Sequence, residues 1–328
     1  MNQGRYDRGP VAPKPFDYVP FADRVDKTPP AGHHRFDPDL LTGYLAGEIV
    51  VLTPLHVASG GIELTERVAP QFAKQSPLIK AFVRSGGVRV IPGSTLKGAV
   101  RSVVEAITPS TVGKVDRRTG VPKLLEEPRG VDKKKPPTDE KNMLSPADRM
   151  FGVMNYLGPV QFSDAPQIGD AVMLVEQPSL YAPRTLGPVK GRKFYKHGRP
   201  AKGNVPVEAV PPEGGRFVWR CDFSNLSAAE LGVLLIALGQ GDPPLHLKLG
   251  GGKPACYGSV RVQRAKLRLR SDVVGDYLSW EGTETAGEPS VYLQAAWEQK
   301  GFVLRPQWQK LSEIMKWPND RDCPSGLY

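Results

Sequence analysis

A predicted helix over residues 94–107 begins directly after a proline-glycine turn and carries two cations near its start. Ser94 and Thr95 stand at its beginning, where unpaired amides and the helix dipole favour an anion. Lys97 and Arg101 are four residues apart, so they share a face at a cost of about a few tenths of a kcal/mol unless an anion joins them. The segment therefore predicts a phosphate site, the alternative being an ordinary capped core helix.

A second candidate for backbone recognition is the glycine-rich stretch over 245–258. Three consecutive glycines allow close approach of a bulky partner, and a lysine stands on each side of them. The candidate residues are Lys248, Gly250, Gly251, Gly252 and Lys253. A nucleotide-binding P-loop is excluded, because proline follows the second lysine and the loop leads into a predicted strand.

The third candidate is a basic segment over 184–202 that contains no acidic residue. Cations that neutralise phosphates and aromatic rings that stack on bases are typical of nucleic-acid binding. Its candidate residues are Arg184, Lys190, Arg192, Lys193, Phe194, Tyr195 and Lys196. A solvated basic loop is the alternative.

Catalytic and metal-binding patterns are weaker. The histidines at 56, 197 and 246 are isolated, and no hydrolase or metal-ligand motif occurs, so we expect no metal and no cofactor. Cys221, Cys256 and Cys323 are far apart and form no C-x-x-C pair, which predicts neither a disulfide framework nor a zinc site.

Bulk properties point to a polyanionic partner. The formal charge of +10 on 328 residues favours nucleic acid over a small acidic ligand, although a merely soluble basic protein would share that charge. Because the sequence contains neither a signal-peptide pattern nor a long apolar run, we expect a cytoplasmic protein without a membrane partner.

These candidates need a scaffold, and the hydrophobic pattern predicts an α+β one. Strands are expected over 44–52, 88–91, 158–163, 217–223 and 259–269, and helices over 94–107 and 227–238. Without the short strand at 88–91, the order is β-α-β-β-α-β. That is the ferredoxin-like arrangement, also found in RNA-recognition modules, in which two helices cover one face of an antiparallel sheet.

The rest of the chain surrounds this core. We expect an extended N-terminal arm over 1–40, a core over 41–270 and a C-terminal segment over 271–328 packed on it. Within the core, 111–146 reads as a mobile loop and 166–215 as a long insertion.

Several of these stretches resemble a known family. Residues 53–60 (TPLHVASG), 91–101 and 249–260 are similar to signature stretches of the RAMP superfamily of CRISPR-associated RNA-binding proteins. Residues 150–152 with 158–164, 191–197 and 225–238 resemble a type III-related branch, and the likeness covers about 14–265.

The resemblance implies a ferredoxin-like core, a thumb inserted between its second and third strands, and a filament of subunits along a guide RNA. Ser94, Thr95, Lys97 and Arg101 would hold the guide backbone, the triple-glycine loop would lie against it, and the basic insertion would kink the guide-target duplex. The implied partners are guide RNA, target RNA, further copies of the chain, a cap-type subunit and a separate nuclease.

One departure bears on catalysis. Slicing members of the family carry an aspartate in the loop after the first strand, whereas 42–115 contains no aspartate and that loop offers only Glu63 and Glu66. We therefore expect a subunit that positions RNA and is not an enzyme. The alternatives are an endoribonuclease using His56 or His246 as general base, a single-copy capping subunit, and a general single-stranded RNA-binding module.

Overall fold

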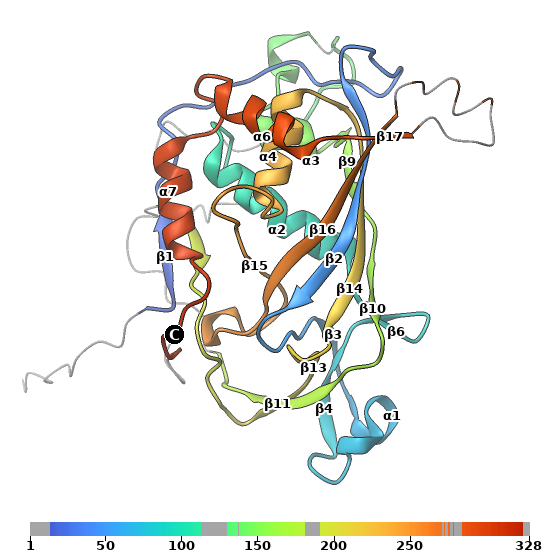
Figure 1. Ribbon diagram of the computed structural model, residues 1–328, viewed down its shortest axis with the longest axis vertical. Helices are drawn as coiled ribbons and strands as arrows, with labels where there is room; N and C mark the ends of the chain where they lie inside the picture. Colours follow the sequence, from blue (N-terminus) through green and yellow to red (C-terminus); the bar gives the residue numbers. More distant parts are fainter. Residues whose placement is uncertain are drawn as a thin grey trace, which may run out of the picture.

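A central antiparallel sheet organises the protein, as the ribbon of the computed structural model shows (Figure 1). The structure describes residues 14–112, 130–136, 138–180, 191–270, 272, 275, 278 and 284–323. The sheet has the order β15-β16-β2-β14-β10-β6-β5, with β9 also pairing with β14 and β17 with β16. Its strands are β2 (Leu41–Val51), β5 (Arg84–Ser85), β6 (Val88–Ile91), β9 (Val160–Phe162), β10 (Ala165–Ile168), β14 (Arg216–Leu226), β15 (Leu247–Lys248), β16 (Ser259–Arg270) and β17 (Glu284–Ala286).

The two longest predicted strands follow their sequence patterns. β2 lies between β14 and β16, as expected of a strand with apolar residues on both faces. In β14 the alternate residues Phe217, Trp219, Cys221 and Phe223 are buried, which confirms the period-two pattern.

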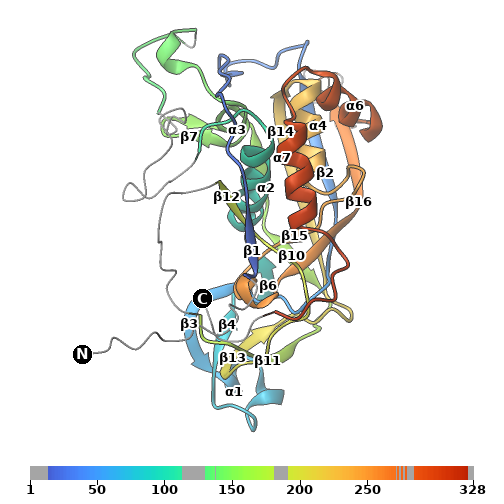
Figure 2. The ribbon, with the colours of Figure 1, turned by 90° about the vertical axis from the view of Figure 1, so that its left-hand side faces the viewer.

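The helices lie on one face of this sheet (Figure 2). They are α2 (Gly93–Ile107), α3 (Pro146–Phe151), α4 (Ala228–Ala237), α6 (Pro289–Glu298) and α7 (Arg305–Ile314). The expected α+β class, with helices covering one face of an antiparallel sheet, is confirmed. Among the residues that the structure describes, no helix is long and apolar enough to cross a membrane.

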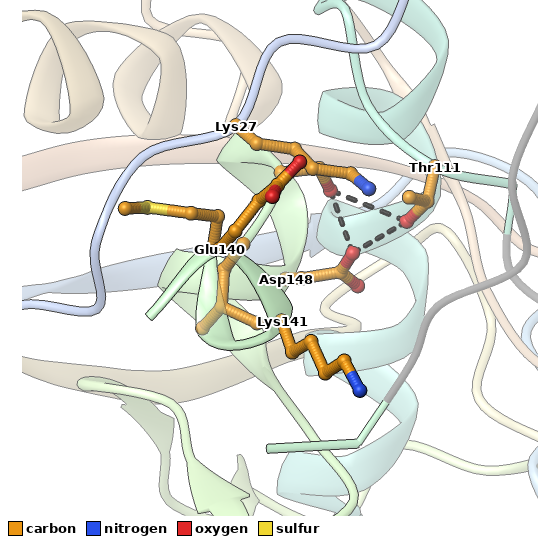
Figure 3. Close-up of a pocket in the computed structure, with 8 residues that line it drawn as sticks. Lys27, Thr111, Glu140, Lys141 and Asp148 are labelled. Atoms are coloured by element: carbon orange, nitrogen blue, oxygen red, sulfur yellow. Dashed lines mark hydrogen bonds between the residues drawn. The ribbon is translucent and has the colours of Figure 1, made fainter. Parts of the chain in front are cut away.

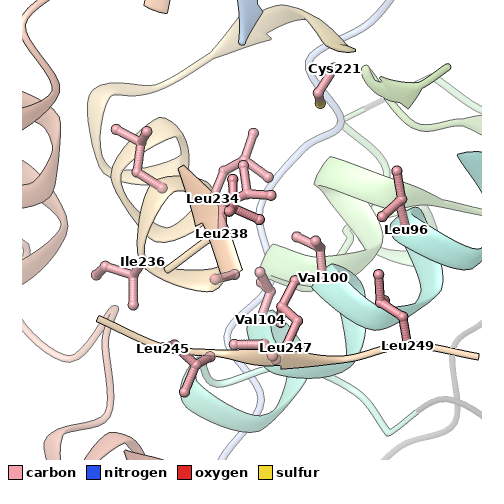
Figure 4. Close-up of a cluster of buried hydrophobic side chains, with 14 of the residues drawn as sticks. Leu96, Val100, Val104, Cys221, Leu234, Ile236, Leu238, Leu245, Leu247 and Leu249 are labelled. Atoms are coloured by element: carbon pink, nitrogen blue, oxygen red, sulfur yellow. The ribbon is translucent and has the colours of Figure 1, made fainter. Parts of the chain in front are cut away.

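The core forms where α2 and α4 meet the sheet. In Figure 4, Val100 and Val104 of α2 lie close to Leu247 of β15, and Leu234 of α4 belongs to the same buried cluster. α4 begins with the predicted capping box: the Ser227 hydroxyl accepts the N–H of Glu230 at 3.2 Å and the Glu230 carboxylate accepts the N–H of Ser227 at 2.9 Å. α4 is buried all round because α6 packs on its outer side.

A second sheet extends from the end of the central one (Figure 1). It has the order β11-β13-β4-β3, formed by β3 (Ala58–Leu64), β4 (Leu78–Phe82), β11 (Met173–Gln177) and β13 (Val205–Ala209), with the short helix α1 (Thr65–Val68) after β3. The sequence analysis predicted neither strand. Every residue of β3 is exposed, so β3 has no buried alternation, and β4 does alternate but is only five residues long. The insertion also begins later than expected, since β10 continues the central sheet to Ile168.

The N-terminal arm is more regular than its prolines indicate. β1 (Phe16–Val19) pairs with β12 (Arg192–Tyr195) in an antiparallel ribbon beside α7. Its partner strand is remote in sequence, so local composition could not predict the pairing. The remaining elements are the hairpin of β7 (Gly152–Val153) with β8 (Tyr156–Leu157) and 3-10 turns over Pro70–Phe72, Glu140–Asn142 and Lys253–Ala255.

The structure bears on two further predictions, one about the loop over 111–146 and one about the cysteines. Within the expected mobile loop, residues 113–129 and 137 lie outside the described residues, while Thr111, Asn142 and Ser145 at its ends are buried. The spacing of the cysteines indicated no disulfide framework, and one disulfide is nevertheless present. Cys256 and Cys323 form a disulfide with their Cα atoms 5.9 Å apart, because the fold brings the C-terminal segment back to the glycine-rich loop.

Candidate nucleic-acid interface

One groove, of about 350 Å³, gathers residues from all three sequence-predicted candidates. It lies between the first turns of α2, the strand β12 and the loop that follows β15. Its polar and aromatic lining residues are Ser94, Thr95, Ser102, Lys193, Phe194, Tyr195, Lys248 and Lys253. No carboxylate is among the residues that line it. The groove is therefore cationic, with hydroxyl groups on one wall.

The start of α2 differs in detail from the prediction. Pro92, not Ser94, is the N-cap, and the helix begins at Gly93 without a side-chain cap. The N–H of Gly93 donates to the Asp164 carboxylate at 2.8 Å, so this acid already offsets part of the positive helix end. The Ser94 and Thr95 hydroxyls are left to line the groove.

Lys97 and Arg101 lie away from the groove lining. The Arg101 guanidinium donates to the Glu105 carboxylate at 2.6 Å, the Asp148 carboxylate at 2.7 Å and the Gly152 carbonyl at 2.7 Å. These partners satisfy the charge of Arg101 within the fold. Burial, followed by the nearby Arg101, lowers the pKa of Lys97. The spacing of these two residues predicted an anion site shared between them. The structure instead shows Arg101 in an ion-pair network with Glu105 and Asp148.

The acid that holds Arg101 is itself fixed. The Asp148 carboxylate accepts hydrogen bonds from the hydroxyls of Thr111 and Ser145, the latter at 2.7 Å (Figure 3). These residues border a cavity of only about 40 Å³, lined also by Lys27 and Glu140. The cavity is too small for a nucleotide, so we assign the cluster a structural role.

The basic segment is divided between core and groove. Arg192 is ion-paired with Glu105 and donates to the Ser102 carbonyl at 3.2 Å, and Phe194 is 8% exposed. Lys193 and Tyr195 line the groove, with the Lys193 ammonium 4.1 Å from the Phe16 ring centroid. Lys196 is half-buried and its N–H donates to the Pro15 carbonyl, whereas Arg184 and Lys190 lie outside the described residues.

The triple-glycine loop is shaped by the segment over 53–60. Gly250 and Gly252 both have a φ of +69°, and a Cβ on Gly250 would collide with the His56 carbonyl. That carbonyl accepts the N–H of Gly251 at 2.8 Å. The Thr53 hydroxyl donates to the Cys256 carbonyl at 3.0 Å. The sequence analysis singled out both 53–60 and 245–258, but nothing in the sequence indicated that the first segment contacts the second.

Lys248 stands at the base of the groove and is only 6% exposed. Its ammonium donates to the Tyr257 carbonyl at 3.1 Å. Burial, together with the positive charges of Arg321 and Lys253, lowers the pKa of Lys248 to about 7. Burial also lowers the pKa of Lys253.

The histidines considered as general bases are buried. His56 is 3% exposed, with Nδ1 2.7 Å from the Glu208 carbonyl, and His246 is 7% exposed. Burial lowers the pKa of each. Glu63 lies on exposed β3 and Glu66 in α1. No group of three or more potential metal ligands occurs among the described residues.

Comparison with known proteins supplies one match. The family model described as RAMP superfamily matches residues 48–261, more than half of the chain. The matched range includes the start of α2, the basic strand β12 and the triple-glycine loop. None of the curated proteins compared with the chain matches it.

Proposed function

Because the chain belongs to the RAMP superfamily, whose proteins are CRISPR-associated and bind RNA, we propose that it is a guide-RNA-binding backbone subunit of a CRISPR effector complex. In this role several copies bind along one guide and hold a target RNA for cleavage by a separate nuclease. The guide, the target, neighbouring copies, a cap-type subunit and the nuclease are the partners of this proposal.

The observation that carries the proposal is the convergence of three remote segments on one cationic groove. Lys193 and Lys253 supply positive charge, Lys248 places its amine at the base of the groove, and Ser94 and Thr95 supply hydroxyl donors. Phosphates are recognised by such donors without regard to base sequence, as a guide of changing sequence requires. Tyr195 adds an aromatic ring to the same lining.

We further propose that the core is ferredoxin-like in the strict sense. β16, β2, β14 and β9 are neighbours in that order and all pair antiparallel, while α2 and α4 follow the first and third of these core strands in the chain. This supports the β-α-β-β-α-β assignment. The thumb of this scheme is the insertion between β10 and β14, which contains β11, β12 and β13.

A binding role without cleavage is the catalytic part of the proposal. His56 and His246 are buried and hold little positive charge near neutral pH, which suits packing better than proton transfer to a large substrate. Cleavage of target RNA by the purified chain alone, abolished by Glu63→Gln or Glu66→Gln, would contradict this part.

The experiment that tests the proposal is analysis of copurifying nucleic acid. Purified chain should retain RNA of one defined length or a regular length ladder, and a double variant, Lys193→Glu with Lys253→Glu, should lose it. A matched control is Lys266→Glu, because Lys266 lies on β16 away from the groove lining. RNA of random length would favour a general RNA-binding module, and native mass distinguishes one copy from several.

A further inference from the structure

Lys248 is the most deeply buried cation that lines the groove. Its side chain comes from β15, which pairs antiparallel with β16 through Leu247 and Lys248. Among the described residues, the Tyr257 carbonyl is the one acceptor for its ammonium. An ammonium has three donors, so a charged Lys248 leaves two of them without a protein partner.

The described groups that act on the charge of Lys248 are positive. Arg321 of the C-terminal segment and Lys253 of the glycine-rich loop both repel its positive form. The His197 ring is held between the Ser259 hydroxyl and the His246 carbonyl, and burial lowers its pKa to about 3, so it is neutral. Among the residues that the structure describes, no acid stabilises the charge of Lys248.

The walls of the groove do not change this balance. α2 contributes the uncharged Ser94 and Thr95, and β12 contributes the cation Lys193. The side chains of the groove by themselves are therefore a poor environment for a charged amine. A phosphodiester in it would supply both the missing acceptors and the missing negative charge.

We propose that RNA binding in this groove is coupled to proton uptake, and that the proton is taken up by Lys248. The inference rests on the proposed function, since it needs RNA in the groove. When RNA binds, the neutral amine of Lys248 accepts one proton from solvent. The resulting ammonium donates hydrogen bonds to a phosphate oxygen and to the Tyr257 carbonyl. No covalent bond to RNA forms or breaks.

The direction of the pH effect follows from linkage. In the free protein the pKa of Lys248 is lowered to about 7, and a bound phosphate raises it toward the ordinary lysine value. Below about pH 7, Lys248 is protonated in the free protein and in the RNA complex, so the affinity for RNA is constant. Above about pH 7, the complex holds one more proton than the free protein and free RNA together. Affinity should fall roughly tenfold to thirtyfold from about pH 6 to about pH 8.5.

The test uses the full-length chain freed of copurifying RNA and a short, labelled single-stranded RNA of mixed sequence at constant salt. Titration calorimetry at about pH 8 in buffers of different ionisation enthalpy should report uptake of close to one proton per bound site. This measurement needs no variant. Uptake near zero with intact binding would overturn the inference while leaving the proposed function standing.

Variants then assign the proton to a residue. Lys248→Arg keeps a permanent charge and should bind with little pH dependence, whereas Lys248→Met should bind weakly at every pH. Lys266→Arg is the control, because Lys266 is exposed on β16 and does not line the groove, and it should keep the wild-type profile. An unchanged profile in folded Lys248→Arg would assign the proton elsewhere and refute the role of Lys248. Absence of RNA binding by the wild-type chain at every pH would instead refute the proposed function.

Discussion

The hydroxyl of Thr53 bridges two points of the glycine-rich region: it donates to the Cys256 carbonyl at 3.0 Å and accepts the Ser259 N–H at 2.9 Å. Thr53 lies two residues after the end of β2, so it ties the end of this central strand to Cys256 before β16 and to Ser259, the first residue of β16. Both bonds are buried. The position of the triple-glycine loop therefore depends on a side chain two hundred residues away in sequence.

Thr53→Val should lower both stability and RNA affinity. It keeps the shape of the side chain but leaves a buried carbonyl and a buried N–H unpaired, at a cost of about 1–3 kcal/mol. Denaturant unfolding measures the stability change. Ser312→Ala is the control, since the Ser312 hydroxyl donates to the Gln309 carbonyl on an exposed helix turn and its loss should change stability little.

Gly250→Ala should cost more than Gly86→Ala. Both glycines have positive φ, +69° and +56° respectively, so both variants share the backbone penalty. Only at Gly250 would the added Cβ meet backbone, the His56 carbonyl, whereas nothing lies within 4 Å of a Cβ on Gly86. The difference in unfolding free energy between the two variants measures the contact with His56. Equal costs would contradict the close approach.

Arg101→Met should act on folding, not on RNA contacts. Its removal leaves the buried Glu105 and Asp148 without their shared cation and should destabilise by about 3 kcal/mol. Lys97→Met tests the adjacent cation and should leave stability nearly unchanged. If the folded Arg101→Met variant lost RNA binding but kept wild-type stability, the assignment of a structural role to Arg101 would be contradicted.

Stability of the RNA-free protein should rise with pH above neutrality. In the folded protein the pKa of Lys248 is lowered to about 7, whereas in the unfolded chain it has the ordinary lysine value. Between these two pH values the unfolded chain binds more protons than the folded protein, so unfolding becomes less favourable as pH rises. The melting temperature at pH 9 should exceed that at pH 7 by less in Lys248→Met than in wild type. A melting temperature that falls equally in both would contradict this.

Much of the scaffold could be predicted from the sequence, since its signals are local. The capping box at Ser227 and the alternation from Phe217 to Phe223 are satisfied within a few residues by hydrogen bonding and burial. The three stretches that line the groove were identified from charge, glycine content and helix-start pattern, which are also local properties.

Tertiary structure decided which cations face the groove. The sequence analysis treated Arg101 and Arg192 as free charges. The fold brings Asp148 to Arg101, which is also paired with Glu105 one turn along the same helix, and it brings Arg192 to Glu105. Conversely, Lys248 is set apart from other lysines only by burial and by cations converging from remote segments. The sequence identifies the charged residues. Whether each charge is paired, solvated or buried depends on neighbours that are brought together only in the folded chain.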